Sequence, residues 1–470
     1  MVFSSYLFLF FFLPLALAVY YLSPKKLKHL TLTLVSYIFY GWANPWFMPL
    51  MLFTTTVDYT DGRMMAKFPC RKKLFLTISV VVDLAVLGFF KYFNFGIENY
   101  NTLMTTMGIP EWQYAGFFRI VLPLGISFYT FQSMSYVIDL YRGDAKVVTN
   151  WIDYACFVSM FPQLVAGPIV RFQDIADQLI ERTYSWDKFA RGIAFFMFGM
   201  GKKILLANPC GKIADVCFST ADLHFGDAWY GITSYAFQIY YDFSGYSDMA
   251  IGLGLMLGFV FAKNFDSPYK SCSITEFWRR WHMSLSTWLR DYLYIPLGGN
   301  RKGKVRTYVN LTLVMLLGGL WHGASWNFLI WGGIHGGYLS FERLLGKESV
   351  YHRMPKIIQV ALTFFIVLIA WVFFRADTLP DAWRYLTSMF GGSGAAANIS
   401  GGAIAAGLIY SPYYLVNFIM AAFAVWALPT TWDFTRKLNW WKILWAMTVF
   451  VLALIALTTQ SYNPFIYFIF

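Results

Sequence analysis

Charged residues are scarce in this chain of 470 residues: only 13% are Asp, Glu, Lys or Arg, about half the share of a typical soluble domain. Cysteine and histidine are scarce too, with five and six residues. Hydrophobic residues make up 58% of the chain and aromatic residues 21%. So little charge cannot cover the surface of a soluble enzyme or nucleic-acid binder of this size, and so apolar a chain is not disordered. The composition predicts a polytopic, all-α membrane protein.

The cysteines form no CxxC pair and no Cys/His spacing typical of a metal site. The chain also lacks the HExxH motif of zinc proteases and the GxSxG motif of serine hydrolases. We therefore expect free thiols that pack as small apolar groups, and no bound metal.

Apolar stretches occur along the whole chain and predict about ten to twelve membrane helices, some tilted and some re-entrant, in a single domain 1–470. Asn44 and Pro45 interrupt the stretch 30–59, and both its flanks are basic, so we expect a broken helical hairpin or a re-entrant pair there. The other expected spans are 6–22, 74–93, 121–140, 154–170, 190–207, 229–261, 308–331, 334–345, 357–374, 403–428 and 440–457.

The chain has a net charge of +12, and half of this excess lies in one block, residues 263–306, with nine basic residues against three acidic ones. In a membrane protein, such an excess marks a cytoplasmic face. Ser273 is a candidate helix N-cap, and apolar side chains follow it at spacings of three or four. We therefore expect an amphipathic interfacial helix. A membrane anchor without chemistry is the alternative, and position alone favours it. The apolar face consists of Trp278, Trp281, Leu285 and Trp288.

A basic, glycine-rich loop follows in the same block. Residues 298–304 nearly match the phosphate loop GxxxxGK[ST], but Val305 stands where the magnesium-binding hydroxyl is required. We therefore reject an ATPase, whereas the loop could still meet an anionic donor from the cytosol. The residues that we predict to bind this donor are Arg279, Arg280, Arg290, Arg301, Lys302 and Lys304.

Among the histidines, His322 is the strongest candidate for chemistry. It lies in the sequence LWHGASW, in an apolar stretch with no other titratable group from Val309 to Trp331. Ionisable groups in membranes often mark functional sites, and neutral imidazole is a natural general base. A core histidine that bonds across helices is an equally good interpretation. His282 either contacts a phosphate-bearing donor or caps a helix, whereas the glycines around His335 favour close helix packing.

Three further patterns are ambiguous. The GxxxG pattern at Gly254 and Gly258 indicates helix packing rather than a dinucleotide site, because it lies in an apolar stretch. Asp242 and Asp248 either line a polar cavity or pair with the arginines. Segment 465–470 (FIYFIF) contains one hydroxyl nucleophile, Tyr467, among apolar groups, and an aromatic interfacial belt is its alternative interpretation.

Several motifs together resemble the AlgI branch of the membrane-bound O-acyltransferase (MBOAT) family. They include the initial MVFSS, GISFYTFQ at 125–132, FPQLVAGP at 161–168, DFSGYSD at 242–248, the motif 273–299 and LWHGASW. The similarity extends over nearly the whole chain, and the motif 273–299 is its most specific part. By this resemblance, His322 matches the principal catalytic histidine of the family and His282 its second important histidine.

The resemblance implies tilted helices around a central funnel or tunnel in the bacterial inner membrane. A cytosolic thioester, acetyl-CoA or another acyl thioester, then supplies acetyl groups for O-acetylation of an extracytoplasmic polysaccharide such as alginate or peptidoglycan. A periplasmic acetyltransferase with an SGNH hydrolase-like fold completes the transfer. Segment 465–470 resembles the aromatic motif of the D-alanylation system, so Tyr467 is the expected acyl relay, although Ile469 replaces a polar residue of familiar versions. A non-enzymatic transporter or channel is the competing class.

Overall fold

The computed structural model describes residues 1–114, 116, 118–220, 223–346, 353–392, 407–460 and 462–464. This part of the chain is helical and contains no strand, so the predicted all-α class is confirmed. It forms two compact units, which are described separately, and the single domain 1–470 stays a prediction. Unit 1 comprises Met1–Ser185, Leu257–Phe261 and Gly323–Ser325; unit 2 comprises Trp186–Met256, Ala262–His322 and the described residues from Trp326 onward.

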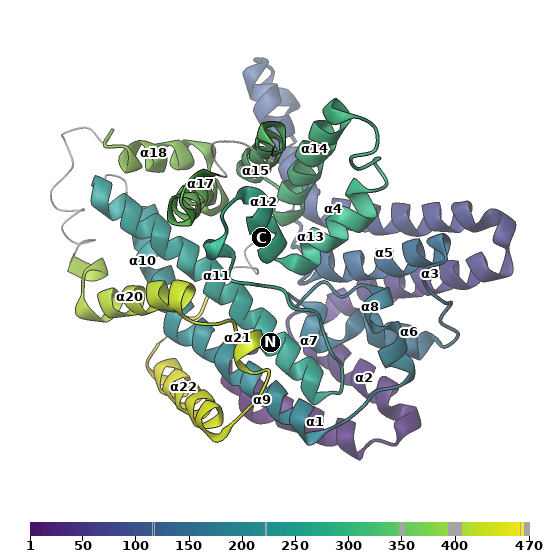
Figure 1. Cartoon of the computed structure of the whole chain (residues 1–470). Helices are drawn as coiled ribbons and strands as arrows, with labels where there is room; N and C mark the ends of the chain where they lie inside the picture. The colour runs from purple at the N-terminus through teal and green to yellow at the C-terminus, as the bar shows by residue number, and fades with distance from the viewer. Residues whose placement is uncertain are drawn as a thin grey trace. The chain divides into compact units, whose positions relative to one another are not determined.

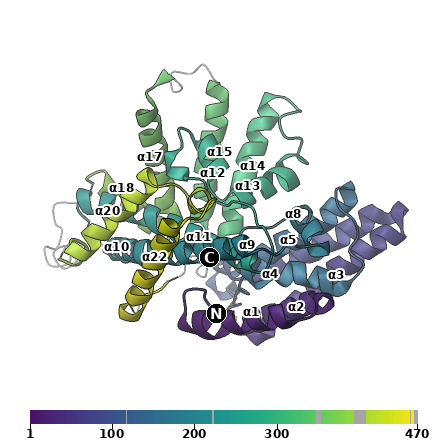
Figure 2. The same ribbon diagram turned by 60° about the horizontal axis from the view of Figure 1, so that its bottom comes forward.

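Unit 1 contains three long helices that pack against one another, α3 (Met48–Lys67), α4 (Lys72–Thr106) and α5 (Ile126–Arg142) (Figure 2). The buried face of α4 is partly polar, because Ser79 on it donates a hydrogen bond to Asp58 of α3. The other helices of unit 1 are α1 (Leu13–Leu22), α2 (Lys28–Gly41), α6 (Trp151–Ser159), α7 (Phe161–Leu164) and α8 (Phe172–Ile180), with a π-helical turn at Phe8–Phe12.

The break predicted within residues 30–59 is confirmed, and the choice between a hairpin and a re-entrant pair stays a prediction. Helix α2 ends at Gly41, and a short 3-10 turn at Pro45–Phe47 leads into α3. The Asn44 side chain accepts a hydrogen bond from the backbone N–H of Trp46 at 3.0 Å, which satisfies a donor that the turn leaves free.

Unit 2 is centred on α11 (Phe225–Met256), which packs along α9 (Trp186–Gly201) and α10 (Asn208–Ser219) (Figure 1). Helices α9 and α11 approach closely because glycines face each other: a Cβ added at Gly199 would lie 2.5 Å from the carbonyl oxygen of Gly245. The predicted packing pair Gly254 and Gly258 is wrong, since Gly258 lies beyond the end of α11 with φ 87°.

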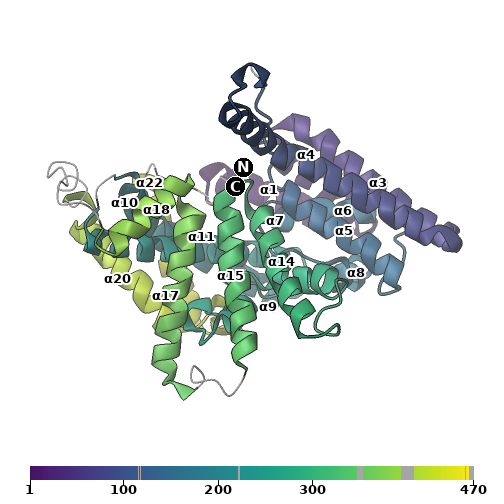
Figure 3. The same ribbon diagram turned by 90° about the horizontal axis from the view of Figure 1, so that it is seen from above.

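A second group of helices in unit 2 places α15 (Trp326–Leu345) between α14 (Lys304–His322) and α17 (Lys356–Arg375) (Figure 3). A Cβ at Gly332 of α15 would collide with the Met315 carbonyl of α14, so these helices touch through their backbones, as the glycines around His335 predict. The expected continuous span 308–331 is wrong. Its helix α14 ends at His322, and a second helix, α15, begins at Trp326.

The remaining segments of unit 2 are short or lie late in the chain. A π-helix (Lys202–Ala207) joins α9 to α10 without a break, and a second one (Arg290–Tyr294) follows α13. The other helices are α12 (Ile274–Arg280), α13 (Met283–Leu289), α18 (Leu379–Met389), α20 (Pro412–Ala427), α21 (Thr431–Phe434) and α22 (Trp440–Thr459).

Three described helices are long and apolar enough to cross a membrane, namely Pro69–Thr106, Lys356–Arg375 and Trp440–Thr459. Two shorter apolar helices, Phe8–Leu22 and Pro412–Ala427, accompany them. Large apolar side chains remain exposed on these segments, as lipid contact requires. The structure supports a membrane protein, and the number of ten to twelve membrane helices stays a prediction.

Candidate active site

The most specific sequence motif, 273–299, begins with a helix start that is capped from two sides. The Ser273 hydroxyl accepts the N–H of Glu276 at 3.0 Å, as predicted. Glu342 of α15 also accepts the N–H groups of Ile274 and Thr275, at 2.6 and 2.9 Å. These carboxylate contacts satisfy donors that the first turn of α12 leaves free, and they tie the motif to α15.

The single amphipathic helix expected after Ser273 is wrong. The chain forms α12 and α13, and His282 between them adopts the left-handed conformation with φ 42°. Non-glycine residues rarely adopt this conformation, and strained backbone of this kind is concentrated at functional sites. The expected interfacial face does not lie on a surface either, because its four residues are at most 8% exposed and pack in the protein core: Trp278, Trp281, Leu285 and Trp288.

His282 is fully buried, and its hydrogen bond fixes its tautomer. Its Nδ1 lies 3.2 Å from Oδ1 of Asn264, which also accepts the backbone N–H of Ser284 at 3.2 Å. An N–H can only donate, so this atom is the amide oxygen and Nδ1 of His282 carries the proton. The lone pair of Nε2 then has no hydrogen-bond partner among the described residues. Burial lowers the pKa of His282 to about 3, which keeps the ring neutral.

His322 is the last residue of α14 and only 4% exposed. Three aromatic rings surround its imidazole, with centroid distances of 5.0 Å to Trp321, 5.2 Å to Trp331 and 5.3 Å to Phe374. The carbonyl groups at a helix C-terminus favour positive charge. The end of α14 would therefore stabilise a positive charge on this ring.

His335 has the opposite hydrogen-bond pattern to His282. The indole N–H of Trp278 donates to its Nδ1 at 3.2 Å, so a neutral His335 carries its proton on Nε2. Its ring also packs on Trp331 with a centroid distance of 4.9 Å. The hydrogen bond from Trp278 joins α12 to α15 and fits the structural role expected for His335.

The three histidines belong to one aromatic cluster, which we define as His282, Trp321, His322, Trp331 and His335. Trp321 contacts the rings of both His282 and His322, and Trp331 contacts those of both His322 and His335. Residues from α14, α15 and the junction between α12 and α13 thus meet in a desolvated region with few other polar groups. Such a region suits proton transfer to a buried base.

The six predicted donor-binding residues fall into two groups. Arg280 forms an ion pair with Glu276 at 2.7 Å, and Arg290 forms one with Asp291 at the same distance. The other four are exposed, and no carboxylate in the described ranges pairs with them; they are Arg279, Arg301, Lys302 and Lys304. Loop 298–304 follows a π-helix rather than a strand, so the structure does not form a phosphate loop of the ATPase type.

The comparisons with known proteins agree with this architecture. Residues 146–376 match MBOAT, the membrane-bound O-acyltransferase family. The chain is 46% identical to the probable alginate O-acetylase AlgI of Pseudomonas putida over the full length of both proteins. The chain belongs to the MBOAT family. This MBOAT protein is also 51% identical to the probable alginate O-acetylase AlgI of Azotobacter vinelandii, over 83% of the chain and 78% of the relative.

A more distant relative has a different named activity. The peptidoglycan O-acetyltransferase of Helicobacter pylori is 37% identical over 84% of this MBOAT chain and 80% of the relative. Family membership makes the chain a membrane acyltransferase and favours that class over the transporter or channel. The roles of its individual site residues stay predictions.

The two aspartates of the DFSGYSD motif pair with lysines that sequence reasoning did not single out. Asp242 pairs with Lys203 at 2.7 Å and Asp248 with Lys202 at 2.6 Å, so the expected pairing with arginines is wrong. The signal was available, because two adjacent lysines interrupt the expected apolar span 190–207. Tyr467 lies outside the described residues, which end at Pro464.

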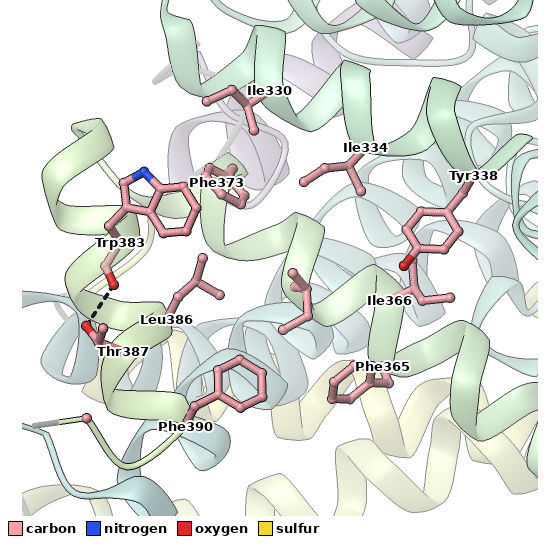
Figure 4. Close-up of a pocket in the computed structure, with 12 residues that line it drawn as sticks. Ile330, Ile334, Tyr338, Phe365, Ile366, Phe373, Trp383, Leu386, Thr387 and Phe390 are labelled. Atoms are coloured by element: carbon pink, nitrogen blue, oxygen red, sulfur yellow. Dashed lines mark hydrogen bonds between the residues drawn. The ribbon is translucent and has the colours of Figure 1, made fainter. Parts of the chain in front are cut away.

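An apolar pocket of about 690 Å³ lies between α15, α17 and α18 of this MBOAT protein (Figure 4). Its wall includes Ile334, Phe365 and Trp383, and no histidine or charged side chain lines it. The hydroxyl groups of Tyr338 and Thr387 also line it, but the pocket offers no imidazole or carboxylate base, so the chemistry is better sought in the aromatic cluster.

Proposed function

We propose that this MBOAT protein moves acetyl groups from acetyl-CoA across the bacterial inner membrane for O-acetylation of a polysaccharide. The named activities of its relatives, alginate O-acetylase and peptidoglycan O-acetyltransferase, support an acetyl group and a polysaccharide acceptor. The observation that carries the proposal is the burial of His322 among aromatic rings at the end of α14.

His322 acts as the general base, and Tyr467 is the acceptor. The imidazole takes the phenol proton while the phenol oxygen attacks the thioester carbonyl carbon. The carbon–sulfur bond of the tetrahedral intermediate then breaks, and the thiolate leaves with the proton from the imidazolium. The products are an acetyl ester on Tyr467 and free CoA, so atoms and charge balance. Burial of the thioester in the aromatic cluster limits its hydrolysis by water.

His282 supplies a hydrogen-bond acceptor beside this reaction. Its Nδ1 proton is engaged by Asn264, so Nε2 can act only as an acceptor. Trp321 lies against both His282 and His322, which supports a shared site rather than two separate ones.

The donor binds at the cytoplasmic face. The phosphate groups of CoA are anionic, and Arg279, Arg301, Lys302 and Lys304 are exposed and without acidic partners in the described structure. Arg280 and Arg290 already have acidic partners and contribute less. On the other side of the membrane, the acetyl ester passes to a serine of a periplasmic SGNH-type acetyltransferase, which acetylates the polysaccharide.

A single-turnover experiment tests the central step. Purified protein receives acetyl-CoA, and CoA release and acetylated peptides are measured for the wild type, His322→Gln and Tyr467→Phe. We expect His322→Gln to slow acetyl transfer about 100-fold or more, as loss of a general base does. Tyr467→Phe should abolish the acetyl ester in the peptide that contains segment 465–470.

His335→Gln is the matched control for the base, because it alters another histidine of the same aromatic cluster. Transfer at the wild-type rate by a folded His322→Gln variant would overturn the base assignment. An acetyl ester on Tyr462, or full polysaccharide acetylation by Tyr467→Phe, would overturn the relay.

The donor site has its own test. The triple variant Arg301→Gln/Lys302→Gln/Lys304→Gln should raise KM for acetyl-CoA about tenfold and leave kcat unchanged, because only uniform binding is lost. Arg290→Gln, which removes a residue already paired with Asp291, is the comparison. An unchanged KM in the triple variant would exclude this loop from donor binding.

A further inference from the structure

We propose that Lys203 is the centre of a polar clamp that holds Tyr462–Pro464 and thereby positions the segment that follows. The clamp is defined as Lys203, Asn208, Asp215, Asp242 and Arg375. This inference deepens the proposed function, because it rests on Tyr467 as the acyl relay. It adds positioning residues to the reaction, none of which touches the donor.

Lys203 connects Tyr462–Pro464, which we call the tail, to helix α11. Its ammonium group forms an ion pair with Asp242 at 2.7 Å and donates a hydrogen bond to the backbone carbonyl of Pro464. The side chains of Lys203 and Asp242 are 3% and 1% exposed. Desolvating two charges is costly, so a buried pair of this kind is weak as a stabilising device. This pair also binds the carbonyl of Pro464, so holding the tail is a more specific role for it than stabilising the fold.

The preceding tail residue is held independently. Asn208 donates a hydrogen bond from Nδ2 to the carbonyl of Tyr462 at 3.2 Å. The Tyr462 hydroxyl donates to Asp215, and Arg375 pairs with the other carboxylate oxygen of Asp215 at 2.7 Å. Two backbone carbonyls and one hydroxyl of a three-residue stretch are therefore bound by charged or amide side chains.

The clamp and the aromatic cluster share a rigid element. Asp242 and Phe243 are neighbours on α11, and the Phe243 ring packs on His282 with a centroid distance of 4.6 Å. Tyr467 follows Pro464 by three residues in the sequence. Holding Pro464 restricts the region that a residue three positions further on can reach, which is the benefit of a tethered substrate.

Lys202 provides a matched control within the same π-helix. It pairs with Asp248 of α11 at 2.6 Å, and both of these side chains are less than 20% exposed. The hydrogen bonds of the tail run to Lys203, Asn208 and Asp215 instead. A change at Lys202 thus removes a similar ion pair to the same helix without a described tail contact.

The experiment compares two neutralised pairs in the full-length protein, Lys203→Met/Asp242→Asn and Lys202→Met/Asp248→Asn. Removing both charges avoids the cost of one uncompensated buried charge. Three quantities are measured: hydrogen exchange of the peptide containing 462–470, the rate of acetylation at Tyr467, and the rate of acetylation of a synthetic FIYFIF peptide added in trans.

The double variant Lys203→Met/Asp242→Asn should accelerate hydrogen exchange of the tail peptide. It should also slow Tyr467 acetylation by about tenfold or more, the range for loss of hydrogen bonds to a charged group. Acetylation of the added peptide should stay at the wild-type rate, since the aromatic cluster is intact. The double variant Lys202→Met/Asp248→Asn should leave all three rates unchanged.

If hydrogen exchange of the tail peptide is unchanged in the variant Lys203→Met/Asp242→Asn, the clamp is wrong. A parallel loss of activity on the added peptide would also overturn it, because the pair would then support the fold and not position the tail. If Tyr467→Phe retains full polysaccharide acetylation, the relay fails, whereas the exchange measurement still decides whether Lys203 holds the tail.

Discussion

The buried state of His282 predicts a specific loss of stability in acid. The pKa of His282 is about 3 in the folded protein because burial disfavours the charged ring, against 6.5 for an ordinary histidine. Between these values the unfolded chain binds more protons than the folded chain. The free energy of unfolding therefore falls as pH drops below about 6.5, and the loss levels off below about 3.

The magnitude follows from the same two values. Lowering the pH from 7 to 4.5 should cost about 2.5 kcal/mol through His282 alone. Carboxylates also titrate in this range, so the wild-type curve by itself does not isolate the histidine. The variant His282→Gln removes the titrating ring and keeps a polar side chain that can donate to Asn264.

The assay is thermal or denaturant unfolding in detergent micelles across this pH range. The difference between the wild type and His282→Gln should change by about 2.5 kcal/mol and favour the variant progressively in acid. His224→Gln, at an exposed histidine of unit 2, is the control for the loss of any histidine. A pH-independent difference for His282→Gln would refute the desolvated, neutral ring.

Two further predictions concern the support of the aromatic cluster. Gly332→Ala should lower the free energy of unfolding by about 1–3 kcal/mol and reduce acetyl transfer, because its Cβ collides with the Met315 carbonyl and separates α15 from α14. The control is Gly333→Ala, whose Cβ would lie 3.7 Å from Leu316 and which should be tolerated in the same unfolding and transfer assays. Glu342→Gln should lower the unfolding free energy by about 1–2 kcal/mol, because a neutral amide caps the start of α12 less well, and Arg343→Gln next to it is the control. Equal melting temperatures within either pair would contradict the packing or the cap.

The sequence predicts the helical class well because low charge and long apolar stretches leave few alternatives. It also predicts the break at Asn44 and the cap at Ser273, since both depend on residues within one turn. The N-cap predicts where α12 begins, but its end depends on His282 in a left-handed conformation. A positive φ is uncommon for any residue other than glycine, so a continuous helix was expected and is wrong.

Long-range contacts account for the other errors. The tryptophan stripe has the spacing of a surface anchor, yet Trp281 packs against Trp371 of α17, 90 residues away in the sequence. The GxxxG pattern predicts a contact at Gly258, whereas the actual crossing uses Gly245 against Gly199. Periodicity shows which residues share a face, but it does not show which element covers that face.

The donor-binding residues illustrate the same limit. Their positive charge is evident in the sequence, but Arg280 pairs with Glu276 one turn before it and Arg290 with the adjacent Asp291. The importance of Lys203 depends on Asp242 and on Pro464, 261 residues further along the chain. Only the folded chain brings these three residues together.

The π-helix Lys202–Ala207 makes this region sensitive to chain length as well as to side-chain identity. A π-turn holds about one residue more than an α-turn, and in an α-helix neighbouring residues diverge by about 100°. The wider turn lets both Lys202 and Lys203 reach aspartates of α11. Deleting one residue here would convert the turn to α-helix and rotate the lysines relative to α10, even though every charged side chain remained. Insertions and deletions in this short stretch should therefore be as damaging as the loss of Lys203 itself.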